Sequence, residues 1–249
     1  MPNIPNPYSE FFREPNLLIP GNKPIGPVKV DWGVAPPGLI NYWLFGTNDR
    51  RYDLTGKYRT TCSSPLIEVL DGERAAEFTA ADGNEYSASG VIETGAQFSV
   101  LMRIYIPTGS FATGNPYIFG GYGTSSTTDK LSLLGYSNDN IYYDYGDTSA
   151  GRINTSIAAH YDKWTDIAFT TTNVGSGYKA IYFDGVEQTF DYTPDAPSGD
   201  VDNFTIGSWP GGSDDFTGYK SYLMFFNKEL TPEDVVNIPK DPYYFLIPA

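Results

Sequence analysis

The most regular feature of the chain is the alternation of apolar and polar residues over short segments. Apolar side chains occupy every second position from Phe98 to Ile106, a period typical of a strand with one face against a core. Similar runs, each ended by Gly, Asn, Asp or Ser, predict strands at 38–45, 75–80, 98–106, 117–119, 130–136, 141–145, 164–172, 178–183, 186–190, 204–207 and 218–227. About ten to twelve short strands predict an antiparallel sandwich or jelly roll.

Two hairpins and one helix start are indicated by residue type. Asp184 and Gly185 join two alternating runs, and this pair favours the positive φ angles of a tight hairpin turn. The polar residues 137–140 predict a second hairpin turn. Thr231 followed by Pro232 suits the N-cap and first position of a helix that ends near residue 237.

The first 37 residues differ from the rest. They hold nine of the 19 prolines, and proline fixes φ and removes a backbone donor, so an extended arm without helix or central strand is expected. The arm also carries apolar residues, which a disordered tail would lack. We therefore expect it to pack on its own sandwich or on a neighbouring subunit. The predicted division is an arm (1–37), a sandwich (38–238) and a Pro- and aromatic-rich C-terminal tail (239–249).

The net charge of −14 argues against a nucleic-acid partner, because an acidic surface repels phosphate. Apolar runs stay well short of the roughly 20 residues that span a bilayer, so no membrane insertion is expected. The first twelve residues lack the basic and apolar regions of a secretory signal. The expectation is a protein made in a cytoplasm that stays soluble.

A set of motifs lies in the order found in one large superfamily. The matching segments are 38–45 with Asp53-Leu-Thr-Gly56, 98–106, 164–169, 180–186, 204–208, 216–218 and 227–235. Together they resemble the laminin-G-like branch of the concanavalin A-like lectin/glucanase superfamily, over roughly 38–238. The resemblance implies an all-β, two-sheet jelly-roll sandwich. It leaves function open, because one fold hosts lectins, enzymes and scaffolds.

The flanks narrow the context. Residues 19–32 and 241–248 resemble extensions of laminin-G-like proteins encoded by bacteriophages and prophages. This resemblance implies a virion component made in the host cytoplasm: a capsid decoration, fibre or host-surface-binding protein. Its partners would be other virion proteins or copies of itself, as a homo-oligomer, contacted through arm and tail.

The sequence offers few residues that could carry out catalysis. Glycosidases of this superfamily place two carboxylates across a groove, and no Glu-x-Asp-x-x-Glu run is present in the chain. The single histidine, His160, has no nucleophile motif that it could serve. The sequence therefore predicts a non-enzymatic protein with no catalytic residues; a glycosidase is the least favoured alternative.

Glycan binding is the main alternative to a purely structural role. Trp209 lies in a Gly/Pro loop, where a core tryptophan is unexpected, and its ring could stack on a sugar face. Tyr122, Tyr143 and Tyr145 are further ligand-binding candidates. The competing interpretation is that these tyrosines cover a second sheet or an interface.

Calcium is a candidate cofactor of such a lectin. Asp53, Asp214 and Asp215 are the predicted metal ligands, with Asp200 and Asp202 as further acids. Hard oxygen ligands from loops suit Ca²⁺. Aspartates in Gly/Ser loops also form turns without any metal, so a purely structural role of these residues stays open as the alternative.

Overall fold

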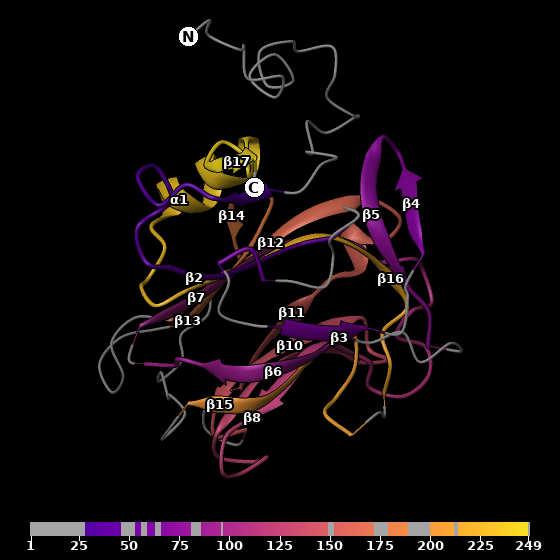
Figure 1. The fold of residues 1–249 in the computed structure, drawn as a ribbon. Helices are drawn as coiled ribbons and strands as arrows, with labels where there is room; N and C mark the ends of the chain where they lie inside the picture. Colours follow the sequence, from indigo (N-terminus) through magenta and orange to yellow (C-terminus); the bar gives the residue numbers. More distant parts are fainter. Residues whose placement is uncertain are drawn as a thin grey trace, which may run out of the picture.

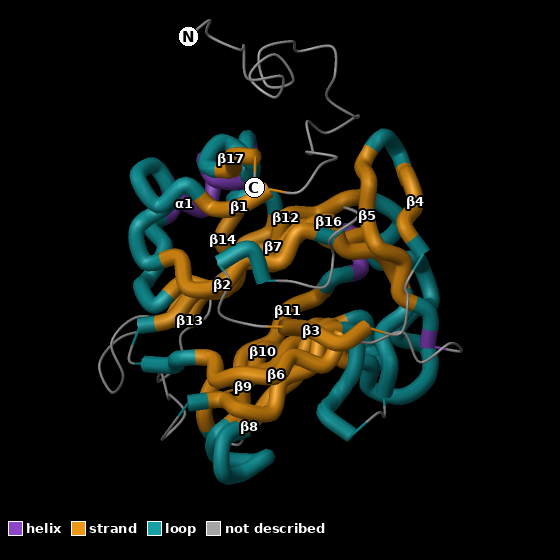
Figure 2. Tube along the Cα trace, in the orientation of Figure 1, coloured by secondary structure: helices purple, strands orange, loops and turns teal. Residues whose placement is uncertain are grey.

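The computed structural model describes residues 28–45, 53–55, 59–62, 66–80, 86–95, 97–148, 152–171, 179–188, 200–211 and 214–248, without the side chains of 59–62, 86–91 and 248. The predicted fold is confirmed: two antiparallel sheets face each other as the layers of a sandwich (Figure 1). Helix α1 (Pro232–Asn237) lies on the outer side of one sheet, and strands make up most of both layers (Figure 2).

One layer is an eight-stranded sheet in the order β14-β13-β12-β7-β16-β5-β4, with β2 also paired to β16. Its strands are β2 (Leu39–Leu44), β4 (Ile67–Leu70), β5 (Glu73–Phe78), β7 (Phe98–Tyr105), β12 (Trp164–Thr171), β13 (Lys179–Phe183), β14 (Val186–Glu187) and β16 (Gly218–Phe226). On the side of β16 away from β7, β5 pairs with its first residues and β2 with its last.

The other layer is a seven-stranded sheet in the order β11-β10-β9-β8-β15-β6-β3. Its strands are β3 (Arg59–Cys62), β6 (Tyr86–Ile92), β8 (Tyr117–Tyr122), β9 (Lys130–Gly135), β10 (Asn140–Gly146), β11 (Arg152–Ser156) and β15 (Val201–Ile206). Every neighbouring pair is antiparallel.

The predicted local features are confirmed. Asp184 and Gly185 have φ angles of 51° and 80° and close the hairpin of β13 and β14. Strands β9 and β10 form the second predicted hairpin. Thr231 caps α1 by accepting a hydrogen bond from the backbone N–H of Asp234, and Pro232 is the first helical residue.

The main core lies between the two sheets. Trp43, Phe204 and Phe225 come from β2, β15 and β16, and their ring centroids lie 5.3–6.0 Å apart. Such aromatic pairs stabilise a core beyond the burial of their area. The inner rings of both sheets therefore hold the layers together.

A second core covers the outer face of the eight-stranded sheet. Leu101 of β7 is fully buried there, so the expectation that this strand is exposed on one face is wrong. The cover consists of α1 and the C-terminal segment, from which Tyr243 and Phe245 insert into the second core. Figure 1 shows α1 and β17 (Leu246–Pro248) lying on this outer side.

The ends of the described chain pair with each other. Strand β1 (Val28–Val30) runs antiparallel to β17, with Val28 opposite Pro248. The described parts of the predicted arm and tail thus pack on their own sandwich. Residues 1–27 of the arm lie outside the described residues. In the part of the chain that is described, no helix combines the length and the apolar character needed to cross a membrane.

Lys220 is an unusual member of the main core. It is 2% exposed, and its Nζ lies 3.5 Å from the ring centroid of Phe78 and 4.1 Å from that of Phe216. Within the described residues this amine has no hydrogen-bond partner. Burial lowers the pKa of Lys220 well below its ordinary value.

Replacing Lys220 by methionine should raise the free energy of unfolding by about 1–2 kcal/mol near neutral pH, because a buried polar group without a partner costs stability. Lysine binds its proton more tightly in the unfolded chain. Wild-type stability should therefore rise with pH until the ordinary lysine pKa is reached, and the advantage of methionine should shrink over that range.

Urea denaturation at neutral and at alkaline pH measures both effects. The matched control is Lys163→Met, because Lys163 is exposed. Equal gains in the two variants, or a gain that stays constant with pH, would contradict the prediction.

Candidate functional site

The outer face of the seven-stranded sheet carries rings and charges in register. Gly120 of β8 lies opposite Ser132 of β9, which lies opposite Asp144 of β10, which lies opposite Arg152 of β11. In the adjacent row, Tyr117, Leu134, Tyr142 and Asn154 face one another across the same four strands. Because side chains alternate between the faces of a strand, both rows lie on one face.

Trp209 lies flat on this face. The loop after β15 brings its ring above Gly120, where a Cβ atom would lie only 2.7 Å from Trp209 Cε3. The indole ring is stacked with Tyr122 at 5.5 Å between centroids and tilted against Tyr117 at 4.8 Å. All three rings are half-buried. We call Tyr117, Tyr122 and Trp209 the first platform.

A compact ion cluster adjoins the first platform. Asp144 has a fully buried side chain and accepts hydrogen bonds from Arg152 Nε (2.6 Å) and Nη2 (2.9 Å). Lys130 Nζ lies 3.0 Å from Asp144 Oδ2 and 4.8 Å from the centroid of Trp209. Two cations and one carboxylate leave one net positive charge at this place, on a chain whose net charge is −14.

A second pair of rings lies beyond the ion cluster. Tyr136 and Tyr142 are half-buried, and their centroids are 4.4 Å apart. The Arg152 guanidinium carbon lies 5.8 Å from the Tyr136 centroid and 5.3 Å from the Tyr142 centroid. Asn138 Nδ2 donates to the Tyr142 hydroxyl at 2.9 Å. We call Tyr136 and Tyr142 the second platform.

The ion cluster sets the protonation of its members. Burial alone would raise the pKa of Asp144, but hydrogen bonds from Arg152 and the charge of Lys130 outweigh it and leave the pKa below its ordinary value. Burial, together with the nearby charge of Asp144, raises the pKa of Tyr117 to about 12. The site therefore keeps an ionised carboxylate beside neutral tyrosines, which can donate hydrogen bonds.

Trp209 and Tyr122, both predicted from the sequence as ligand-binding, are brought together by the fold. The prediction is wrong for Tyr143 and Tyr145, which are fully buried in the main core. Tyr143 stacks on Phe169 at 4.5 Å and Tyr145 on Phe98 at 5.2 Å, so neither ring is available to a ligand. The outward ring of β10 is Tyr142, one residue away.

The predicted metal ligands do not converge. Asp53 is 1% exposed and accepts from Tyr42 N, Asn41 Nδ2 and both N–H and hydroxyl of Thr55. These four donors occupy both carboxylate oxygens, so Asp53 holds a turn, and its assignment as a metal ligand is wrong. The described residues contain no group of three or more His, Cys, Asp or Glu placed to hold a metal.

Asp214 and Asp215 lie beside the first platform. The backbone oxygen of Asp214 accepts from Tyr117 N at 2.8 Å, and Asp215 forms a bridge with Tyr117. Asp214 is exposed. A role of these two carboxylates in holding Ca²⁺ stays a prediction, which removal of Ca²⁺ tests.

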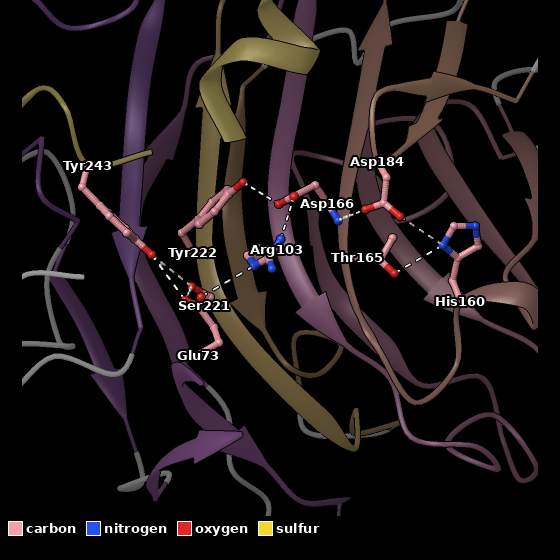
Figure 3. A network of polar contacts seen from close by, with 9 residues as sticks. All are labelled: Glu73, Arg103, His160, Thr165, Asp166, Asp184, Ser221, Tyr222 and Tyr243. Carbon is pink, nitrogen blue, oxygen red and sulfur yellow. Dashed lines mark hydrogen bonds and ion pairs between the residues drawn. The ribbon is translucent and has the colours of Figure 1, made fainter. Parts of the chain in front are cut away.

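A second polar cluster crosses the eight-stranded sheet (Figure 3). Arg103 Nη1 lies 2.7 Å from Asp166 Oδ2, and Arg103 Nε lies 3.7 Å from Glu73 Oε2. Tyr243 donates to Glu73 at 3.3 Å, and Tyr222 donates to Asp166 at 2.8 Å. Burial raises the pKa of Asp166 to about 6, against the opposing effect of Arg103.

This cluster ties the C-terminal segment to the sheet. Glu73, Tyr222 and Tyr243 are buried, and the Tyr243 hydroxyl donates to Glu73. Figure 3 shows His160 at the far end of the cluster, with its Nδ1 3.7 Å from Asp184 Oδ2. Burial and the charge of Lys163 lower the pKa of His160. Glu73 and Tyr243 are buried at one end of this cluster, whereas the rings of the two platforms are half-buried.

A ligand that stacks on Trp209 should bind about tenfold more weakly to Gly120→Ala, because the new Cβ would displace the indole ring. Gly120→Ala keeps every aromatic ring and every charge of the site. The control is Gly95→Ala, since a Cβ at Gly95 meets nothing nearer than 3.9 Å. Calorimetry of both variants with a ligand of this face checks the prediction, and equal affinities would contradict it.

The two sheets pack through their apolar inner faces, and the seven-stranded sheet carries aromatic rings on its outer face. These features define a lectin-type β-sandwich. The chain belongs to the concanavalin A-like lectin/glucanases superfamily, and the profile of its laminin-G-type family matches residues 78–236. The predicted resemblance to this superfamily is thus confirmed.

Solved structures share the fold. The botulinum neurotoxin serotype G binding domain has a TM-score of 0.62 and 13% identity, covering 83% of this chain and 51% of that chain. The serotype D ligand binding domain, in complex with N-acetylneuraminic acid, has a TM-score of 0.62, 15% identity and coverages of 83% and 52%. A mutant of Trypanosoma rangeli sialidase has a TM-score of 0.56, 14% identity and coverages of 81% and 32%. At such identities these likenesses show the fold alone.

Curated sequences add a weaker similarity. Rhizopuspepsin-4 of Rhizopus niveus is 26% identical over 181 residues, 70% of this chain and 46% of that protein. Rhizopuspepsin-3 of the same organism is 29% identical over 136 residues, 52% of this chain and 35% of that protein. The chain spans less than half the length of these relatives, and no activity is transferred from them.

Proposed function

We propose that the protein is a non-enzymatic glycan-binding module, which serves a phage particle as a host-surface-binding, decoration or fibre component. The observation that carries the glycan part is the first platform, in which Trp209 and Tyr122 are stacked and half-buried on one sheet face. Flat rings of this kind match the apolar face of a sugar, and nearby hydroxyls and amides match its polar edge.

The comparisons also support a glycan-binding function. The superfamily description names lectins, and one structural neighbour is a ligand binding domain in complex with N-acetylneuraminic acid. For this chain, sugar binding is our inference from the site. The two platforms consist of aromatic rings and adjoin the ion cluster, and rings can stack on a sugar with or without Ca²⁺ at Asp214 and Asp215.

A binding role is favoured over catalysis by the state of Asp144, the carboxylate of the ion cluster. Asp144 is held by Arg152, Lys130 and Ser132 and is fully buried. A glycosidase needs two carboxyl groups facing the sugar, one of them as acid. Incubation with a polysaccharide panel should therefore release no reducing ends.

The virion part rests on the flanking segments. Residues 19–32 and 241–248 resemble phage extensions, and their described parts pair as β1 and β17. We infer that the arm preceding β1 contacts other subunits. Cross-linking of the full chain, mixed from isotope-labelled and unlabelled copies, should give inter-chain links through Lys23. A monomeric mass without such links would contradict self-assembly.

A glycan array probed with the full chain tests the binding function. The screen is run with Ca²⁺ and again with chelator. Binding that persists in chelator supports the ring-based site, and binding that disappears supports Ca²⁺ at Asp214 and Asp215. An array without any bound glycan, probed with protein of native circular dichroism, would overturn the proposed function.

A further inference from the structure

The two platforms stand on strands that are not neighbours. The first platform lies over β8, through Gly120 and Tyr117, and Tyr142 of the second platform lies on β10. Strand β9 runs between them. Two strand spacings separate the platforms by roughly 10 Å in the direction across the strands. A single sugar ring is too short to cover both.

The surface between the platforms is formed by Leu134 of β9 and by the ion cluster. Ser132 and Lys130 of β9 are buried, as is Asp144 of β10, so their side chains do not rise above the rings. Arg152 is committed to its neighbours: Nε and Nη2 donate to Asp144, and Nη1 donates to Tyr136 at 3.3 Å. Lys130 Nζ is likewise engaged by Asp144 and by the Tyr117 hydroxyl at 3.3 Å. Arg152, whose side chain is 26% exposed, is the polar group of this cluster that a sugar hydroxyl can reach, and its guanidinium is already paired with Asp144.

We propose that the site binds an extended, β-linked oligosaccharide that runs across the strands from the first platform to the second. This inference rests on the proposed glycan-binding function and specifies its ligand. In an extended β-1,4-linked chain, successive rings are turned by about half a revolution, and alternate rings present the same face. Alternate rings therefore lie on Trp209 and on Tyr142, and the ring between them lies over the ion cluster.

The same geometry selects against other glycans. An α-linked chain curves away from a flat sheet and reaches one platform only. A strongly anionic chain gains little here, because both cations are already paired with Asp144 and lie against rings, and the one net positive charge that remains belongs to a chain of net charge −14. The recognised class is a neutral, linear, β-linked glycan at least as long as the separation of the platforms.

The test is calorimetry of the full chain with β-1,4-linked glucose and N-acetylglucosamine oligosaccharides of one to six units. Affinity should rise by about tenfold or more between one and three units, as the second platform is engaged, and then level off. Tyr142→Ala should remove that gain, a loss of about tenfold for the longer chains.

Tyr142→Phe is the matched control, because it keeps the ring and removes only the hydroxyl that accepts from Asn138. It should bind the longer chains like the wild type. Native circular dichroism of the alanine variant shows whether a loss reflects the ring or the fold.

The outcomes separate this inference from the proposed function. Affinity independent of chain length, an unaffected Tyr142→Ala variant, or binding on the array confined to α-linked or branched glycans would overturn the cross-strand ligand and leave glycan binding in place. An array on which nothing binds would overturn both.

Discussion

Replacing Asp144 by alanine is expected to lower the free energy of unfolding by about 3 kcal/mol, the low end of the range for breaking a buried ion pair. The variant leaves Lys130, whose side chain is 6% exposed, and Arg152, 26% exposed, without their counter-charge. Arg152 keeps some access to water, so the loss stays at the low end. Its size is a large share of the stability of a typical domain.

Chemical denaturation monitored by tryptophan fluorescence measures the loss. The matched control is Asp202→Ala, which removes one exposed carboxylate from strand β15 of the same sheet. That change should stay within about 0.5 kcal/mol. Similar losses of unfolding free energy in both variants would contradict the prediction, because Asp144 would then contribute no more to stability than an exposed carboxylate does.

The same residue gives a pH dependence. The pKa of Asp144 lies below its ordinary value in the folded protein. Its contribution is therefore complete above the pKa of the unfolded chain and is lost as the pH falls through the folded value. Acid unfolding of the wild type should be steeper than that of Asp144→Ala, because the variant has already lost this group.

Replacing Trp209 by alanine should weaken glycan binding by about thirtyfold, or about 2 kcal/mol, the usual minimum for a binding hot spot. The indole stacks with Tyr122, contacts Tyr117 and lies beside Lys130. Its removal takes away the largest ring of the first platform. The loss should be larger than that of Tyr142→Ala, since Trp209 serves the short and the long ligands alike.

Calorimetry with the best glycan of the array measures this loss. Trp32→Ala is the control, because Trp32 is 57% exposed and follows β1, which pairs with β17 on the cover of the other sheet. Its affinity should equal that of the wild type. Wild-type affinity of Trp209→Ala would contradict the prediction. It would show that the glycan binds elsewhere than on the seven-stranded sheet.

How much of the candidate site could be predicted depended on the distance between its parts in the sequence. Trp209 was identified because a tryptophan in a Gly/Pro loop has no core to enter. Tyr117, Lys130 and Arg152 carry no comparable local signal, because their roles depend on the register of β8, β9, β10 and β11. The ion cluster joins residues that are as many as 22 positions apart, from Lys130 to Arg152.

The tyrosines of β10 show why a face cannot be assigned from one strand. Tyr142, Tyr143 and Tyr145 occur together, and both faces of the strand carry aromatic rings. A shift of one residue exchanges the core face and the solvent face. Pairing with β9 and β11, and the position of the opposite sheet, put Tyr143 and Tyr145 inside and Tyr142 outside.

The sequence by itself determined the fold class, the central strands, the Asp184-Gly185 hairpin and the Thr231 cap, because each follows from interactions within a few residues. Tertiary structure alone decided which rings are exposed, how the C-terminal segment covers the eight-stranded sheet, and that Asp53 holds a turn. These outcomes depend on contacts between segments that are distant in the sequence, because a side chain is buried only where another segment covers its face of the sheet.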